Sequence, residues 1–222
     1  MKLHVSPAAV VWTIGAVLGG LLLLPPGGEG TAAARENLTT FLAIAAAALV
    51  HECGHIVAAW GCGVPIRALR LDLFGARLDL GGFLSYRREW IVAAGGPLFG
   101  WIAAALAWPA AAHSFREMIQ TGKDPTAVAL FVLASAGLSI LNLLPVGDLD
   151  GGRMLRCTVA PLAGDHVADV TLTVTTALLL AVLWLLSTYA LLRAGHMLSV
   201  FAFSLTLIAR LLAGRSPDLQ KM

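Results

Sequence analysis

His51, Glu52 and His55 are the residues of this chain whose types and spacing are best suited to chemistry. In a helix, side chains four residues apart share one face, with Cβ atoms about 6 Å apart, so both imidazoles can reach one metal ion. The His-Glu-x-x-His pattern is typical of zinc hydrolases, in which the glutamate acts as general base. Glu52 projects about 100° around the helix axis from His51, beside the coordination position that stays open. The pattern therefore predicts one zinc ion per chain and a water molecule that Glu52 activates.

The surroundings of this motif are apolar. Residues 38–50 contain no charged side chain, and the whole chain of 222 residues is 58% hydrophobic and 13% charged. Its mean hydropathy is +0.82. Globular domains carry about 25% charged residues, so the composition excludes an ordinary soluble domain and predicts an all-α polytopic membrane protein. The formal net charge of +2 gives no indication of nucleic-acid binding.

Six apolar segments approach the length of about 20 residues that a helix needs to cross the hydrocarbon core. They are residues 8–24, 38–60, 90–112, 127–144, 170–192 and 197–213. No clear small-residue cleavage site follows the first segment, which favours a retained span over a removed signal peptide. We expect a single membrane domain over residues 1–215, with a core at 37–156, a C-terminal helical hairpin at 170–213 and a short tail at 216–222.

Lysine and arginine are unevenly divided between the two sides of this predicted arrangement. If the N-terminus is cytoplasmic, eleven of these residues lie on the cytoplasmic side and four lie outside. Positive residues are enriched in cytoplasmic loops, so we expect both termini in the cytoplasm. The same orientation places His51 and His55 in the cytoplasmic half of the second span.

A catalytic zinc site needs a third protein ligand in addition to water. Asp150 lies in an irregular stretch between Pro145 and Gly152, and irregular backbone at membrane depth is tolerated only where it is buried. A carboxylate there is costly unless it is paired or binds a metal, which favours Asp150 as the ligand. Asp148 is the competing acid, and its loop composition is typical of a solvated side chain. The histidines at predicted span ends or in loops are further candidates: His113, His166 and His196.

A different period occurs between the second and third spans. Apolar and polar residues alternate from Leu69 to Leu73 and again from Arg77 to Leu80, and residues 74–76 can form a turn. Alternation of this kind predicts a small β-hairpin or sheet over residues 65–82 at the membrane edge. It is either a folded connector with no further role or a sheet edge that accepts an extended peptide as an added strand.

Three motifs together resemble the site-2 protease family of intramembrane zinc metalloproteases, peptidase family M50. They are His51–His55, the Ala94–Pro97 segment, and Asn142-x-x-Pro145 followed by Leu149-Asp-Gly-Gly152. The resemblance covers about residues 37–156. Within the family, the chain most resembles the branch that contains stage IV sporulation protein FB, which cleaves a membrane-associated precursor of a sporulation sigma factor.

The resemblance implies roles for individual residues. His51, His55 and Asp150 would be zinc ligands and Glu52 the catalytic base, while Asn142 and Pro145 would shape the site and the substrate path. Gly95, Gly96 and Pro97 would lie near the substrate, although these residues could equally serve close helix packing. The chain departs from the envelope-stress branch because it shows no PDZ domain, and from many members of the sporulation branch because it shows no C-terminal nucleotide-sensing CBS domain. It also has Val146-Gly147-Asp148 where an apolar or aromatic-Pro pair is common.

The expected function is therefore zinc-dependent endoproteolysis within a bacterial cell membrane. The substrate would be a membrane-associated regulatory protein such as a sigma-factor precursor, and membrane inhibitor or activator proteins are further possible partners. Two alternatives belong to other classes: a catalytically silent metal-binding platform and a zinc carrier. A carrier needs polar ligands along a path across the membrane, which the outer halves of these spans do not offer. A degenerate protease usually lacks the base or a ligand, whereas this chain retains both.

Overall fold

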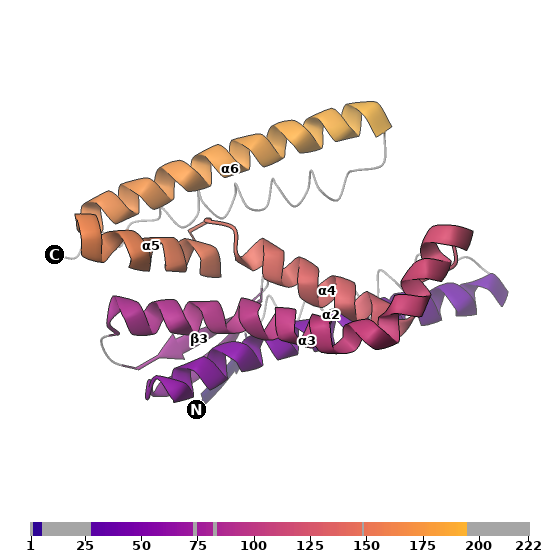
Figure 1. The fold of residues 1–222 in the computed structure, drawn as a ribbon, viewed down its shortest axis with the longest axis horizontal. Coiled ribbons are helices and arrows are strands. Elements are labelled where there is room, and N and C mark those ends of the chain that lie inside the picture. The colour runs from indigo at the N-terminus through magenta and orange to yellow at the C-terminus, as the bar shows by residue number, and fades with distance from the viewer. Residues whose placement is uncertain (1, 6–27, 73–74, 82–83, 148, 195–222) are drawn as a thin grey trace. The chain divides into compact units, whose positions relative to one another are not determined.

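The computed structural model describes residues 2–5, 28–72, 75–81, 84–147 and 149–194. The first and sixth predicted spans, residues 8–24 and 197–213, lie outside the described residues, as does the short tail. The described part is mostly helical (Figure 1). It divides into two compact units, Met1–Leu143 and Leu144–Met222, each of which is considered by itself.

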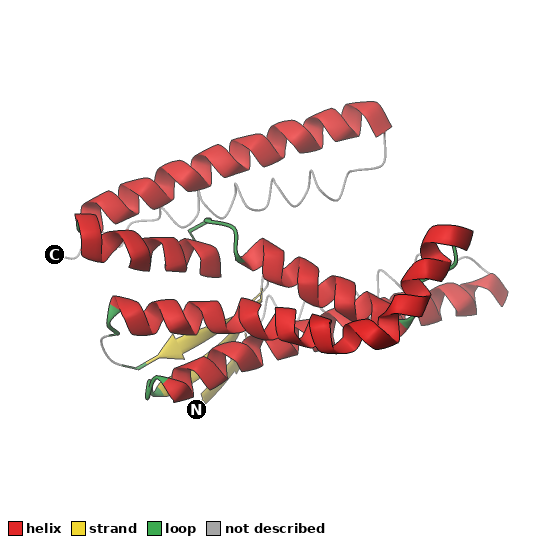
Figure 2. Ribbon diagram, viewed as in Figure 1, coloured by secondary structure: helices red, strands yellow, loops and turns green. Residues whose placement is uncertain are grey.

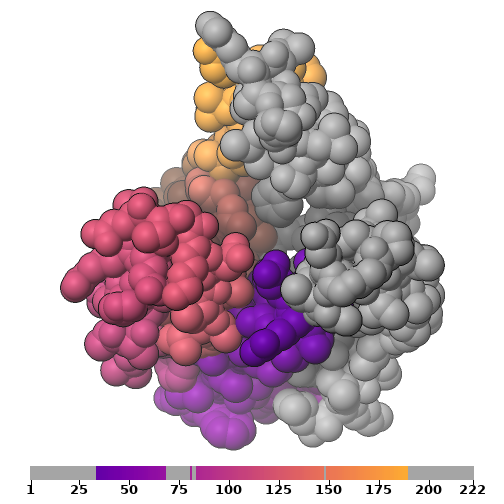
Figure 3. All heavy atoms as spheres, turned by 90° about the vertical axis from the view of Figure 1, so that its right-hand side faces the viewer, coloured from indigo at the N-terminus to yellow at the C-terminus, as the bar shows by residue number. Residues whose placement is uncertain are grey.

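The first unit is built on three helices, α2 (Gly28–Gly61), α3 (Tyr86–Thr121) and α4 (Ala127–Asn142). Each of them packs against the other two. Figure 3 shows the α3–α4 part, in magenta to salmon, lying directly against α2, in indigo. Figure 1 also shows α3 bending in its C-terminal part. Pro109 lies in that half of the helix and supplies a cause, because an internal proline removes one backbone hydrogen bond.

Three described helical segments are long and apolar enough to cross a membrane: Ala34–Gly61, Tyr86–Thr121 and Asp165–Tyr189. α4 is shorter, with 16 residues. Large apolar side chains cover the outer faces of the long segments, and Leu49, Leu106 and Leu178 are 67%, 78% and 63% exposed. Helices that are apolar on their exposed faces are typical of membrane proteins. The arrangement with six spans stays a prediction.

Alanines and the two histidines of the motif line the buried face of α2. Ala43, Ala47, His51, His55 and Ala59 recur every four residues, and all five are buried. Between the two histidines, Gly54 meets Gly95 of α3 so closely that a Cβ added to Gly54 would overlap the Gly95 carbonyl oxygen. Small residues allow this approach of two helix backbones in a membrane, where packing rather than the hydrophobic effect drives association.

The packing of α3 on α4 also depends on small side chains. Ala104 and Ala111 of α3 form a buried cluster with Ala129 and Val132 of α4. One turn before Ala104, Gly100 lies against Ser139, whose Oγ donates to the Ser135 carbonyl at 2.8 Å. These contacts hold α4 close along the length of α3.

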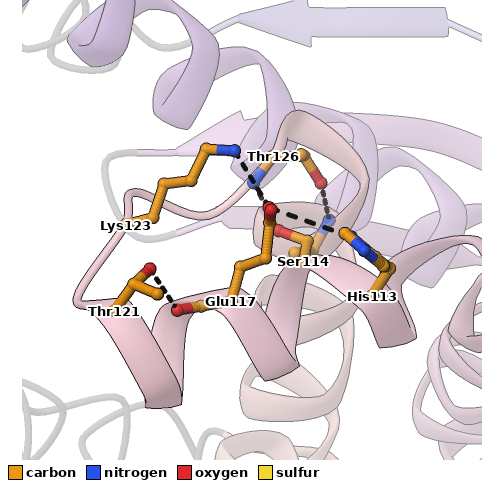
Figure 4. A network of polar contacts seen from close by, with 7 residues as sticks. His113, Ser114, Glu117, Thr121, Lys123 and Thr126 are labelled. Carbon is orange, nitrogen blue, oxygen red and sulfur yellow. Dashed lines mark hydrogen bonds and ion pairs between the residues drawn. The ribbon is translucent and has the colours of Figure 1, made fainter.

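The turn between α3 and α4 is held by polar contacts (Figure 4). Gly122 ends α3 in the left-handed conformation, with φ of 68°. Lys123 then folds back to Glu117 with an Nζ–Oε2 distance of 3.0 Å. Thr126 is the N-cap residue of α4, and its backbone N–H donates to Ser114 Oγ of α3 at 2.9 Å. These contacts reverse the direction of the chain, so that α4 packs back against α3.

A three-stranded sheet is drawn in yellow in Figure 2; two of its strands lie between α2 and α3 in the chain, and the third precedes α2. Its order is β1 (Lys2–Val5), β2 (Ile66–Asp72) and β3 (Gly75–Leu80). β2 and β3 pair antiparallel with Leu69 opposite Leu78, whereas β1 pairs parallel to β2. Residues 74–76 are a turn in the prediction from sequence. In the structure β3 already begins at Gly75, opposite Asp72, and the intervening residues 73–74 lie outside the described part.

The second unit contains α5 (Asp150–Ala163) and α6 (Asp165–Ala194), which pack on each other. Arg156 of α5 joins the two helices through its ion pairs with Asp165 at 3.0 Å and Asp169 at 2.8 Å. The sequence did not predict α5. The expected broken stretch is confined to the residues between Asn142 and Asp150, because Gly151 and Gly152 both lie within the helix.

We expect the substitution Gly54→Ala to destabilise the fold, because its Cβ would meet backbone atoms of α3 that cannot rotate away. The cost of such overpacking is about 1–3 kcal/mol. Thermal unfolding in detergent with a chelator present, so that metal loss does not contribute, should show a lower Tm. Gly137→Ala on α4 is the matched control, because an added Cβ there meets no atom within 4 Å. Equal Tm values for both variants would contradict the close α2–α3 contact.

Candidate metal centre

The two histidines of the motif lie side by side on the buried face of α2. Alanine is the best helix former, and the Ala-rich residues 43–48 precede the motif without interruption. His51 and His55 are 4% and 7% exposed. A buried imidazole needs polar partners, because leaving a polar group unsatisfied in an apolar surrounding costs free energy.

The imidazole nitrogens converge on one point. His51 Nε2 and His55 Nε2 are 3.2 Å apart, and the rings stand nearly perpendicular, at 82°. Two nitrogens bound at about 2.0–2.1 Å to a tetrahedral zinc ion are themselves about 3.3 Å apart. The pair thus already has the separation that a shared zinc ion requires.

The backbone of α3 fixes the orientation of one ring. His55 Nδ1 lies 2.7 Å from the carbonyl oxygen of Val92. A carbonyl oxygen only accepts hydrogen bonds, so Nδ1 carries the hydrogen and donates it. In the neutral imidazole, Nε2 then presents a lone pair toward His51. An outer hydrogen bond of this kind is the usual means of orienting a metal-binding histidine.

Glu52 completes a group of possible ligands. One carboxylate oxygen of Glu52 and one nitrogen of each histidine all lie within 4.8 Å of one another. Glu52 is partly buried, in contrast to the two histidines. The geometry therefore places a carboxylate beside the position where a metal and its water would sit.

Gly95 and Gly96 contact different parts of α2. A Cβ on Gly95 would lie 2.6 Å from both the Ala58 Cβ and the Gly54 carbonyl oxygen, so Gly95 serves close packing. A Cβ on Gly96 would overlap His55 Nε2 and lie 2.7 Å from His51 Nε2. The missing side chain of Gly96 therefore leaves open the space in front of both nitrogens. Pro97 is fully buried beside them in the chain.

An apolar cluster supports the site from the side of the sheet. It consists of Ala59 of α2, Val92 of α3, and Val64, which follows α2. Ile66 of β2 and Leu84 pack against it. Ala59 is one turn beyond His55, and Val92 supplies the carbonyl that His55 contacts. The cluster thus packs the end of α2 against the beginning of α3, next to the contact between His55 and the Val92 carbonyl.

The other predicted site residues have separate surroundings. Asn142 Nδ2 donates to the Leu138 carbonyl of its own helix at 3.0 Å. In the second unit, Asp150 is the first residue of α5 and is 7% exposed, with Arg153 Nη1 at 4.0 Å. Pro145 lies in the loop before α5, where its carbonyl oxygen accepts from Thr176 Oγ1 at 3.3 Å.

Two of the alternative ligands are exposed to solvent. His113 has an 82% exposed side chain and lies near Glu117 in the network of Figure 4. His166 is exposed near the beginning of α6. Asp148 and His196 lie outside the described residues. Sequence reasoning missed the Val92 carbonyl and Thr176, because a backbone acceptor leaves no trace in residue types and a threonine in a span is ordinary.

Comparison with known proteins adds three findings. Residues 109–186 match the family model of Peptidase family M50. The chain is 30% identical over 166 residues to the putative zinc metalloprotease Rip3 of Mycobacterium tuberculosis, a match recorded for two strains. This match covers 72% of the chain but only 35% of the relative, so the chain spans about a third of that protein's length.

The fold is similar to that of the site-2 protease from Methanocaldococcus jannaschii. The TM-score is 0.60 with 18% sequence identity, over 92% of this chain and 86% of that one. The region matched by the family model does not include His51–His55, so the motif on α2 is a separate indication of the same chemistry. The chain is thus similar to Peptidase family M50 over residues 109–186, to a putative zinc metalloprotease over 72% of its length, and to a site-2 protease in its fold.

Proposed function

We propose that the protein is an intramembrane zinc endopeptidase that cleaves membrane-associated proteins. The observation that carries this proposal is the pair of buried imidazole nitrogens 3.2 Å apart, with a carboxylate beside them, on a helix apolar enough to span a membrane. Ordinary packing does not account for two histidines and a glutamate at that depth, because polar groups there are costly unless they have a function.

In this proposal, His51, His55 and Asp150 hold the metal. When bound, zinc lowers the pKa of a water molecule toward about 7 and polarises the scissile carbonyl. Glu52 takes the proton of the attacking water and then transfers it to the nitrogen of the leaving amine. The Val92 carbonyl keeps the His55 ring oriented during these steps, because its hydrogen bond is independent of the reacting atoms.

The depth of the site defines the class of substrate. His51 lies ten positions before the end of α2 at Gly61, which corresponds to about 15 Å of helix. A peptide bond can reach this depth only from a segment that enters the membrane. A helix hides its carbonyl groups in hydrogen bonds, so the substrate must unwind locally before cleavage.

The sheet offers a means of holding an unwound substrate. β2 is its central strand, so β1 and β3 are its edges, and an edge strand can bind an extended peptide through backbone hydrogen bonds. Asn142 and Pro145 would shape the path from the sheet to the metal. The substrates we expect are precursors of membrane-associated transcription factors, such as a sigma factor in the branch that contains stage IV sporulation protein FB, with membrane inhibitors or activators as partners.

We further propose that the sheet and the site face the cytoplasm. The distribution of lysine and arginine supports this orientation, because positive residues favour cytoplasmic loops. The turn between α3 and α4 would then lie on the opposite side. A cytoplasmic site suits a protease that releases a regulatory protein into the cell.

The substitution Glu52→Gln should abolish proteolysis and retain zinc, because it removes the proton acceptor and leaves both imidazoles in place. We expect a loss of about 100-fold or more in cleavage rate. The test is co-expression with membrane-anchored transcription-factor precursors, followed by sequencing of the new terminus and measurement of zinc content. Normal cleavage by this variant would refute the assignment. Zinc transport into liposomes without cleavage would favour the carrier.

Gly96→Ala should abolish zinc binding with only a small effect on folding. Its Cβ would strike the ends of two side chains, whereas that of Gly54→Ala strikes backbone. We expect zinc affinity to fall by about 100-fold or more, beyond the range for a lost outer-shell contact. Competition with a chromophoric chelator measures this affinity in detergent. Gly137→Ala is again the control, and unchanged zinc affinity in Gly96→Ala would show that the space before the nitrogens is not the metal site.

The orientation can be tested by cysteine labelling. In a background without Cys53, Cys62 and Cys157, Asp124→Cys in the α3–α4 turn should react with an impermeant maleimide in intact cells. Arg87→Cys, at the beginning of α3, should react only after the membrane is opened. Both Asp124 and Arg87 are exposed. The reverse pattern of labelling would place the site on the outer side.

A further inference from the structure

The loop that precedes Asp150 is tightly folded. The Val146 N–H donates to the Leu144 carbonyl at 2.8 Å, and the Leu149 N–H donates to the Val146 carbonyl at 2.9 Å. The Leu149 carbonyl in turn accepts from the Arg153 N–H at 3.1 Å, which joins the loop to the first turn of α5. The position of Asp150 therefore depends on where this loop is held.

Gly152 of α5 allows the loop to pack closely against the helix. A Cβ on Gly152 would overlap the Val146 carbonyl oxygen, so only glycine allows the loop to lie this close to the first turn of the helix. This contact sets the distance between the loop and α5. It cannot by itself fix the start of the loop at Pro145.

α6 supplies the contact at the start of the loop. Thr176 is 1% exposed, and its hydroxyl donates to the Pro145 carbonyl at 3.3 Å. The neighbouring Thr175 lies 3.5 Å from the same oxygen, but it has closer acceptors in its own helix, the nearest at 2.9 Å. Thr173 and Thr188 likewise donate to carbonyls one turn back in α6. Threonine hydroxyls in helices ordinarily bond in this way, so Thr176 differs from Thr175 because it makes the shorter bond to Pro145, whereas the shorter bonds of Thr175 stay within α6.

We propose that Thr176 is a positioning residue for Asp150. Its hydroxyl donates to the Pro145 carbonyl and so fixes the start of the loop. The hydrogen bond from Leu149 to Val146 closes the loop, and Asp150 begins α5 directly after it. This inference rests on the proposed function, in which Asp150 is a zinc ligand.

Zinc affinity of the full chain in detergent tests this proposal. Thr176→Val keeps the shape of the side chain and removes its hydrogen bond, so zinc affinity should fall by about 3-fold to 10-fold, the value of one hydrogen bond. Thr176→Ser keeps the hydroxyl and should restore affinity. Thr173→Val is the matched control on the same helix and should bind zinc as the wild type does. Should Thr176→Val fail to accumulate, Thr176→Ala serves the same comparison.

Combining these variants with Asp150→Asn separates this inference from the proposed function. If Thr176 acts through Asp150, Thr176→Val should have no further effect on zinc affinity in the Asp150→Asn background, because coupled residues are not additive. Equal losses in both backgrounds would overturn the inference. So would weakened zinc binding in Asp150→Asn together with normal binding in Thr176→Val. Normal binding in Asp150→Asn would instead remove Asp150 from the proposed site, and the inference with it.

Discussion

The close approach of α2 and α3 at Gly54 and Gly95 is the contact on which the candidate metal centre depends. A single added methyl group on either residue would meet atoms of the facing helix. Because the two backbones touch there, neighbouring residues of α3 lie close to the histidines. The Val92 carbonyl contacts His55, and Gly96 leaves space in front of both imidazoles. The two imidazoles come from one helix, but their orientation and the space before them come from the other.

Much of this centre follows from the sequence, because its information is local. His51, Glu52 and His55 lie on one helix, and helical spacing alone predicts that their ligand atoms meet, as they do. The apolar segments likewise predict α2, α3 and most of α6, since length and hydropathy are properties of single segments. The alternation after residue 65 indicates strands for the same reason, and β2 and β3 do pair.

The remaining features depend on contacts between segments or on the backbone. β1 consists of four residues that pair with β2, more than sixty positions later in the sequence. A local pattern of residues cannot predict such a distant pairing. α5 contains Gly151 and Gly152, which lower helix propensity, yet the adjacent loop needs glycine there to pack. The carbonyl of Val92 is invisible in residue types. The two adjacent glycines of α3 had two possible roles, and only the neighbours of each one distinguish them.

Val92, Gly96 and Gly100 recur every four residues on α3, and each makes a different contact. The first bonds a ring of α2, the second leaves room before two rings, and the third lies against Ser139 of α4. A rotation of α3 about its axis would disturb all three together. One face of α3 therefore links the packing of α4, at Gly100, to the space in front of the two histidines, at Gly96.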